Sequence, residues 1–167
     1  MRSWTRWMLA LSVALACAGG VADAATMAAD ATPERAPVPM SVRGVGQYQG
    51  QWIVLLEDAL GTRRMPIWIG ELEAGAIDMR FKKQKYPRPL THDLLDSTLA
   101  ALGAKIERVD VVDLRDNVFY GRLTVRDAKG ATHFIDARPS DCIALAVGAS
   151  LPIYVAPHVL AAAAATP

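Results

Sequence analysis

The stretch Asp136–Gly148, DARPSDCIALAVG, is the key to this chain because it joins a strand end, a polar turn and an apolar helix. Asp136, Arg138, Ser140 and Asp141 crowd into the turn, and apolar or small residues follow. Polar side chains at such a place either start a helix or form a functional site. These four residues alone do not distinguish the two roles, so the rest of the sequence has to be considered.

The N-terminus has the three parts of a secretory signal peptide. Arg2 and Arg6 give it a positive start, residues 8–17 are an apolar run, and residues 22–24 form an A-x-A cleavage sequence. The run is too short to cross the ~30 Å hydrocarbon core of a bilayer as a helix. We therefore expect a cleaved, periplasmic or secreted protein that meets the membrane only through its signal peptide. A lipoprotein processed at Cys17 is the alternative.

Composition divides the remaining chain into parts. The 167 residues are 52% hydrophobic, enough for one domain with a core. Residues 25–39 are rich in Ala, Pro and Thr without apolar periodicity, which is typical of a disordered linker. We therefore predict a signal peptide over residues 1–24, that linker, a domain over 40–160, and a frayed tail over 161–167.

Charge, cysteine content and the absence of common motifs exclude several kinds of binding and catalytic site. Without the first 24 residues, acidic and basic side chains are equal in number, so any attraction to nucleic acid must come from a local patch. Cys142 then has no partner for an intrachain disulfide and is expected to be a small core residue, with a reactive thiol as the alternative. The chain has no P-loop and no GxGxxG, HExxH, GxSxG or CxxC motif.

Apolar periodicity and turn residues predict an α+β domain with a mixed, largely antiparallel sheet and helices packed on it. In the second predicted helix, Thr91 is the expected N-cap, and Leu95, Leu99 and Leu102 are the expected buried stripe. Strands are predicted over residues 42–48, 51–57, 64–69, 105–114, 118–126, 132–137 and 151–155, and helices over 71–81, 91–102, the apolar stretch after Arg138, and from Pro157.

The chain also contains a possible internal repeat. Shifted by 69 residues, residues 52–76 lie over 121–145 without a gap. Both segments read as strand, turn, strand, tight break and helix, with an acid in the first helical turn. This predicts two similar strand-strand-helix halves, although a chance match of short turn motifs is the alternative.

Four acids fall at strand ends or helix starts: Glu73, Asp93, Asp136 and Asp141. Clustered carboxylates can hold Mg²⁺ or Mn²⁺, which activates water and binds a phosphodiester. Alternatively, each acid favours a helix N-terminus or pairs with Arg138. His92, beside Asp93, is the candidate acid or base, with a capping or packing role as its alternative.

Two basic features could contact a polyanion. The loop between the first two helices combines cations with Phe81 and Tyr86, which suits phosphate contact and base stacking. A second such surface is the strand face formed by Tyr120, Arg122 and Arg126. The alternative is that these charges are only solvated. The candidate substrate-binding residues are Lys82, Lys83, Lys85, Arg88, Arg122 and Arg126.

Four separated blocks resemble, in order and spacing, the bifunctional nuclease family: RMPIWIGELEAGAI, RPLTHDLL, VDLRDNVFYGRL and DARPSDCIALAVGASLPIYV. The resemblance spans about residues 42–160 and implies an α+β domain that acts on both DNA and RNA. An export signal is unusual for such a family, and the loop FKKQKYPR is more basic than expected. The positions that match the family's motifs are Glu73, Thr91, His92, Asp93, Asp113, Arg115, Asp136, Arg138, Ser140 and Asp141.

Two functional hypotheses follow. In the first, the protein is an exported nuclease in which the four acids position a divalent metal, Arg138 neutralises a phosphate oxygen, and His92 is the acid or base. In the second, it is a non-catalytic envelope module, and the turn before the last long helix is a structural Asp/Arg/Ser/Asp knot. The composition permits a homodimer under either hypothesis.

Overall fold

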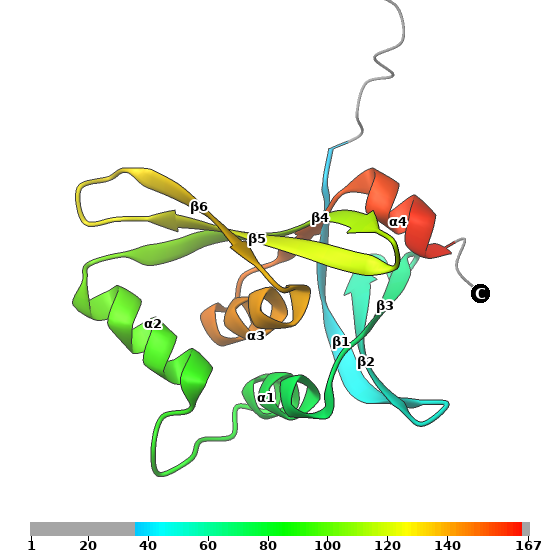
Figure 1. Cartoon of the computed structure of the whole chain (residues 1–167), viewed down its shortest axis with the longest axis horizontal. Coiled ribbons are helices and arrows are strands. Elements are labelled where there is room, and N and C mark those ends of the chain that lie inside the picture. The colour runs from blue at the N-terminus through cyan, green and yellow to red at the C-terminus, as the bar shows by residue number, and fades with distance from the viewer. Residues whose placement is uncertain (1–35, 165–167) are drawn as a thin grey trace, which may run out of the picture. The chain divides into compact units, whose positions relative to one another are not determined.

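Seven strands form one sheet in the computed structural model of the chain, which describes residues 36–164. Their order across the sheet is β3-β2-β1-β7-β4-β5-β6 (Figure 1). Neighbouring strands are antiparallel except β7 and β4, which are parallel. The predicted mixed, largely antiparallel α+β fold is confirmed. The strands are β1 (Val38–Tyr48), β2 (Gln51–Asp58), β3 (Arg64–Trp68), β4 (Lys105–Arg115), β5 (Val118–Arg126), β6 (Thr132–Ala137) and β7 (Ile153–Val155).

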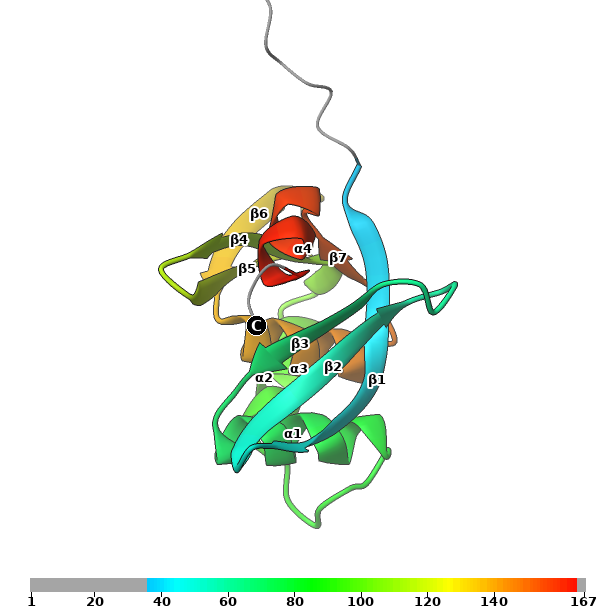
Figure 2. The ribbon, with the colours of Figure 1, turned by 90° about the vertical axis from the view of Figure 1, so that its right-hand side faces the viewer.

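Four helices accompany the sheet within the same residues: α1 (Glu71–Phe81), α2 (Thr91–Ala101), α3 (Pro139–Ala149) and α4 (Pro157–Ala164). α3 packs against β4, β5 and α1, and α1 also contacts β1 and β2. α4 packs against β3 and β4. In Figure 2, β1, β2 and β3 lie side by side, with α1 below them and α4 above. None of these helices is long and apolar enough to cross a membrane.

The two halves predicted from the repeat have the same connectivity. β2 and β3 form an antiparallel pair that leads into α1, and β5 and β6 form one that leads into α3. The first strands of the two halves, β1 and β4, both flank β7. The units β1-β2-β3-α1 and β4-β5-β6-α3 are therefore matched, and they meet at β7 and at the contact between α1 and α3.

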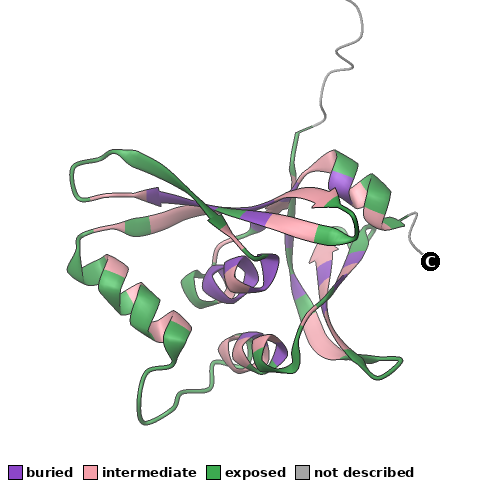
Figure 3. Ribbon diagram, in the orientation of Figure 1, coloured by how far each residue is buried: buried purple, intermediate pink, exposed green. Residues whose placement is uncertain are grey.

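α3 is the helix around which the core is built. Residues 142–146 are completely buried among core residues of the strands (Figure 3). Gly121 of β5 allows this close packing, because a Cβ there would lie 2.7 Å from the Cys142 sulfur. Burial raises the pKa of the Cys142 thiol to about 12, so it stays protonated and unreactive. The prediction that Cys142 is a core residue is confirmed.

α2 is attached differently, and its predicted buried stripe is wrong. Leu95 and Leu102 are 39% and 68% exposed, and no residue of α2 is fully buried, although Leu99 packs partly buried against the core. The reason is that α2 packs mainly against α3, so its apolar side meets too few neighbours. The predicted N-cap is also wrong, because Leu90 is the N-cap and Thr91 is the first helical residue.

Polar contacts attach α2 in place of that stripe. Arg80, in the last turn of α1, donates hydrogen bonds to Asp93 (Nη1 to Oδ1, 2.7 Å) and to Asp96. Its side chain is only 11% exposed. It lies against Gly148 of α3, where an added Cβ would overlap the guanidinium. One arginine therefore joins three helices.

The predicted signal peptide and residues 25–35 of the predicted linker lie outside the described residues. Regular structure begins at Val38 in β1 and ends at Ala164 in α4. Residues 165–167 of the predicted tail also lie outside the described part.

The substitution Gly148→Ala is expected to destabilise the domain by ~1–3 kcal/mol, because its methyl group displaces Arg80 from between the helices. Urea unfolding measures the change. Gly75→Ala is the matched control on α1, since a Cβ there meets nothing within 4 Å. It should be neutral or stabilise the fold by up to ~1 kcal/mol through helix propensity. Equal effects of the two substitutions would contradict the packing of Arg80 on Gly148.

Candidate functional site

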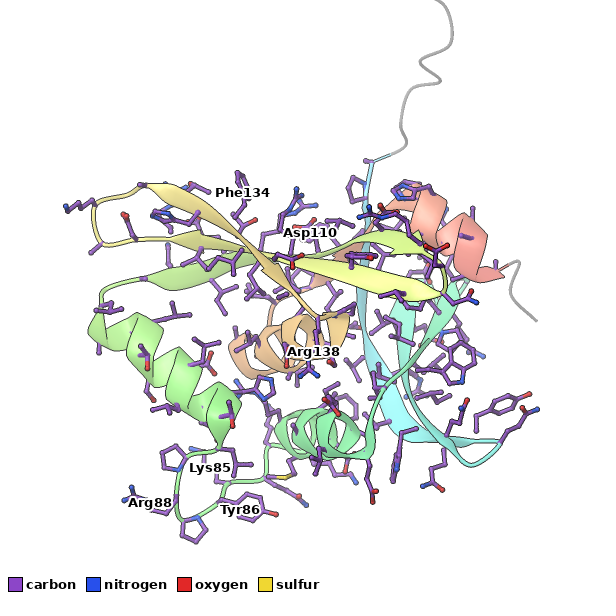
Figure 4. The ribbon with its side chains drawn as sticks, in the orientation of Figure 1. Lys85, Tyr86, Arg88, Asp110, Phe134 and Arg138 are labelled. Carbon is purple, nitrogen blue, oxygen red and sulfur yellow. The ribbon has the colours of Figure 1, made fainter. Side chains whose placement is uncertain are left out.

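Arg138, the residue before α3, links the first turns of two helices. Its guanidinium donates two hydrogen bonds to Asp141, from Nε to Oδ2 at 2.8 Å and from Nη2 to Oδ1 at 3.0 Å. A third bond runs from Nη1 to Oε1 of Glu73 in α1, at 2.8 Å. Figure 4 shows Arg138 between α3 and α1. The contact between these helices therefore places two carboxylates around one cation.

His92 adds a third helix to this group. It lies in the first turn of α2, and its Nε2 is 3.3 Å from Oδ1 of Asp141. The His92 side chain is 16% exposed, whereas that of Arg138 is 65% exposed. We call Glu73, His92, Arg138 and Asp141 the Arg138 cluster. Its two carboxylates lie in first helical turns, where the helix dipole favours negative charge.

The ion pairs set the charge of the cluster. The hydrogen bonds from Arg138 lower the pKa of Asp141, although partial burial of the carboxyl opposes this. The bonds to Asp141 and Glu73 raise the pKa of Arg138 above its usual value. Asp141 is therefore ionised at neutral pH. The cluster places the carboxylates of Glu73 and Asp141 around one guanidinium, and the His92 ring lies beside Asp141.

Two of the predicted catalytic and metal-binding residues, Asp93 and Asp136, lie outside the Arg138 cluster. The Asp93 carboxylate binds Arg80 and accepts a hydrogen bond from the backbone N–H of Leu90 at 3.1 Å, so it holds the start of α2. Asp136 lies in β6 opposite Arg122, and within residues 36–164 its side chain forms no hydrogen bond or ion pair. Strand alternation turns it away from the sheet face that α3 covers.

The structure does not bring the predicted metal ligands together. Among the described residues, no group of three or more His, Cys, Asp or Glu side chains is placed to hold a metal ion. Glu73 and Asp141 bind Arg138 instead, and Asp93 binds Arg80. Because three of the four predicted ligands already bind arginines, no chemical step is assigned to a metal ion.

One set of predicted phosphate-binding residues lies in the loop that leads into α2, the helix that carries His92. These residues occupy the loop between α1 and α2, and Figure 4 shows two of them, Lys85 and Arg88, at its tip. Lys82 is paired with Asp78 at 2.7 Å. The other cations of the loop, Lys83, Lys85 and Arg88, form no ion pair with any residue of the described range.

The second predicted basic set lies on β5, away from the Arg138 cluster. Arg126 donates hydrogen bonds to Glu107 at 2.6 Å and to the Gly130 carbonyl at 2.8 Å, so its charge is already paired with a carboxylate. Arg122 lies over the ring of Phe134, 5.4 Å from its centroid. These arginines and the loop cations do not form one surface.

The sequence analysis missed Arg80, which positions the start of α2 and therefore His92. A signal for it was present. Asp93 and Asp96 are three residues apart on one helix, so they share a face that a cation from a neighbouring helix can bind.

Residues 54–167 match the family described as the bifunctional nuclease domain. Two proteins of Mycobacterium tuberculosis are also similar to this chain: uncharacterized protein MT1877 of strain CDC 1551 and uncharacterized protein Rv1829 of strain H37Rv. Each is 45% identical over 120 residues, which cover 71% of this chain and 70% of the relative.

The substitution Arg138→Gln is expected to make the domain less sensitive to acid. The folded-state pKa of Asp141 is below its usual value of 3.8, so the unfolded chain takes up this proton first as the pH falls. The stability that the pair contributes is present above that value and is lost below about pH 4. Without Arg138, this part of the acid dependence should disappear. Melting temperatures from about pH 6 to about pH 2 measure it.

The control is a double-mutant cycle. Asp141→Asn should flatten the same part of the acid profile, and Asp141→Asn combined with Arg138→Gln should add nothing further. If the double variant is clearly flatter than either single variant, the acid-sensitive pair lies elsewhere.

Proposed function

This chain belongs to the bifunctional nuclease domain family, and from that premise we propose that it hydrolyses phosphodiester bonds of DNA and RNA at the Arg138 cluster. The observation that carries the proposal is the convergence of His92, Arg138 and Asp141 from two different helix starts. A cation, an imidazole and its carboxylate partner are the groups that a phosphodiesterase needs.

Arg138 is suited to bind the phosphate. A guanidinium carries five N–H donors, and three of them are used in the bonds to Asp141 and Glu73. One N–H on each Nη atom remains, and the side chain is largely exposed. Two donors on a planar fork match two phosphate oxygens. They would stabilise the charge that grows on those oxygens as water attacks.

His92 is suited to act as the base. When its Nε2–H is donated to Asp141, the Nδ1 lone pair is free to accept a proton. Asp141 orients the ring toward the proposed water. In the proposed step, His92 takes the proton of a water as the new oxygen–phosphorus bond forms. The ester bond breaks, and the departing alkoxide takes a proton from solvent.

Two further parts of the proposal concern the metal cofactor and the cellular compartment. The divalent metal predicted from the sequence stays a prediction, which EDTA treatment tests. We also propose that the mature domain acts outside the cytoplasm, since residues 2–24 have the charge, the apolar run and the A-x-A sequence of a signal peptide.

The experiment is cleavage of labelled DNA and RNA by the purified mature protein, with and without EDTA. His92→Gln is expected to lower the rate on the order of 100-fold or more. His133→Gln is the matched control, because His133 forms a similar pair with Asp127 at 2.8 Å on an exposed part of β6. Equal losses in both variants, or no cleavage by the unmodified protein, would contradict the proposal.

The same assay tests the sequence-based role of Asp136. Asp136→Asn leaves the Arg138 cluster unchanged, because its side chain forms no ion pair within residues 36–164. If this substitution abolishes cleavage, the reactive centre lies on the other face of the sheet.

The second candidate function is a non-catalytic envelope module. The three bonds of Arg138 favour it, because in this function their role is structural: the bond to Glu73 holds α1 to the start of α3, and the other two fix Asp141. In that case Arg138→Ala lowers the melting temperature sharply. A phosphate-binding Arg138, exposed as it is, can be removed at a cost of ~0–1 kcal/mol.

A further inference from the structure

A groove of about 770 Å³ lies beside α1. Trp52 of β2 lines it from one element and Tyr86 of the α1–α2 loop from another, while α1 contributes Leu72 and Met79. Tyr86 is 59% exposed and Leu72 is 86% exposed. Aromatic and apolar side chains that stay open to solvent in this way form a surface suited to flat, apolar groups.

This groove continues to the Arg138 cluster. A small second hollow is lined by His92 and Asp93 at the start of α2. The two hollows share four lining residues, Ala76, Met79, Tyr86 and Leu90. A chain that lies in the groove and passes Tyr86 therefore reaches the imidazole that we propose as the base.

Unpaired cations lie on the loop beside this groove. Lys83, Lys85 and Arg88 come from the loop that carries Tyr86, and none of them has an ion-pair partner in the described range (Figure 4). The groove lining itself contains Glu71, Asp78 and Lys82, and Lys82 pairs with Asp78 at 2.7 Å. The stacking surfaces of the groove and the free cations of the adjoining loop together make the combination that binds a single nucleic-acid strand through its bases and phosphates.

We infer that this groove binds a single strand of nucleic acid and leads it to His92. Bases stack on Tyr86 and Trp52, and phosphates lie against Lys83, Lys85 and Arg88. A duplex is excluded from this mode because its bases already stack on one another and do not offer their faces. The direction of the strand toward a reactive centre rests on the proposed function, but binding in the groove can be measured without cleavage.

The test uses the mature protein carrying His92→Gln, so that binding is observed without hydrolysis. The probe is a fluorescent single-stranded oligothymidylate of about 12 nucleotides, followed by anisotropy. Tyr86→Ala should weaken binding on the order of 10-fold, whereas Tyr86→Phe keeps the ring and should bind like the parent. Phe134→Ala is the matched control, because this 69% exposed ring lies on β6 and outside the groove.

A second arm tests the charges. Replacing Lys83, Lys85 and Arg88 together with Gln should reduce the slope of log affinity against log salt by about 2, since each single-strand phosphate contact contributes roughly 0.7. An RNA of matching sequence should bind as tightly as the DNA, because stacking and charge need no 2′-hydroxyl. A duplex of the same length should bind more weakly.

The outcomes separate this inference from the proposed nuclease activity. Binding that depends on Tyr86, together with no cleavage by the unmodified protein, supports the groove and overturns the nuclease proposal. Unchanged affinity in Tyr86→Ala and Trp52→Ala, or equal affinity for the duplex, overturns the groove even if cleavage occurs. A change of oligomeric state in Tyr86→Ala without loss of oligonucleotide binding also overturns it, since a second copy of the chain would then occupy the groove.

Discussion

The contact between α1 and α3 is the constraint on which the rest of this structure depends. Each half of the sheet offers one helix, and neither helix can bury its apolar residues against three strands alone. α3 is buried over residues 142–146, and α1 contributes Ala74 and Ile77 to the same core. Once the helices pack together, their first turns lie close enough for Arg138 to bind carboxylates of both. The Arg138 cluster is therefore a consequence of how the core is closed.

α2 adds the reactive candidate His92 but only the partly buried Leu99 to the packing around the core. The helix is held mainly by Arg80 and by the contact of His92 with Asp141, while Leu94, Leu95 and Leu102 stay exposed. A helix held by polar contacts is less firmly fixed than one held by a buried stripe. The basic loop before α2 belongs to the same weakly held segment. The loop leads directly into the helix that carries His92, and it also supplies Tyr86 to the groove.

Sheet geometry decides which predicted residues can act together. Consecutive residues of a strand point to opposite faces, so Asp136 and Arg122 lie on the side that α3 does not cover. Arg138 follows only two residues later but already belongs to the start of α3. The face with Asp136 also holds Asp110, which is 3% exposed and whose Oδ2 has no hydrogen-bond partner among the described atoms. The face with Asp136 therefore carries charged side chains, whereas the face that α3 covers is part of the apolar core.

The sequence by itself determined the strands, the helices and the matched halves, because apolar periodicity, turn residues and the repeat are local signals. It also marked Glu73, His92, Arg138 and Asp141 as candidates. Only the tertiary structure decided that these four meet while Asp93 and Asp136 do not, because that depends on which helices touch and on which strand face a residue falls. The exposed side of α2 is a further case. Its leucine spacing is that of a buried stripe, but burial requires a neighbouring element, and no local pattern records whether one is present.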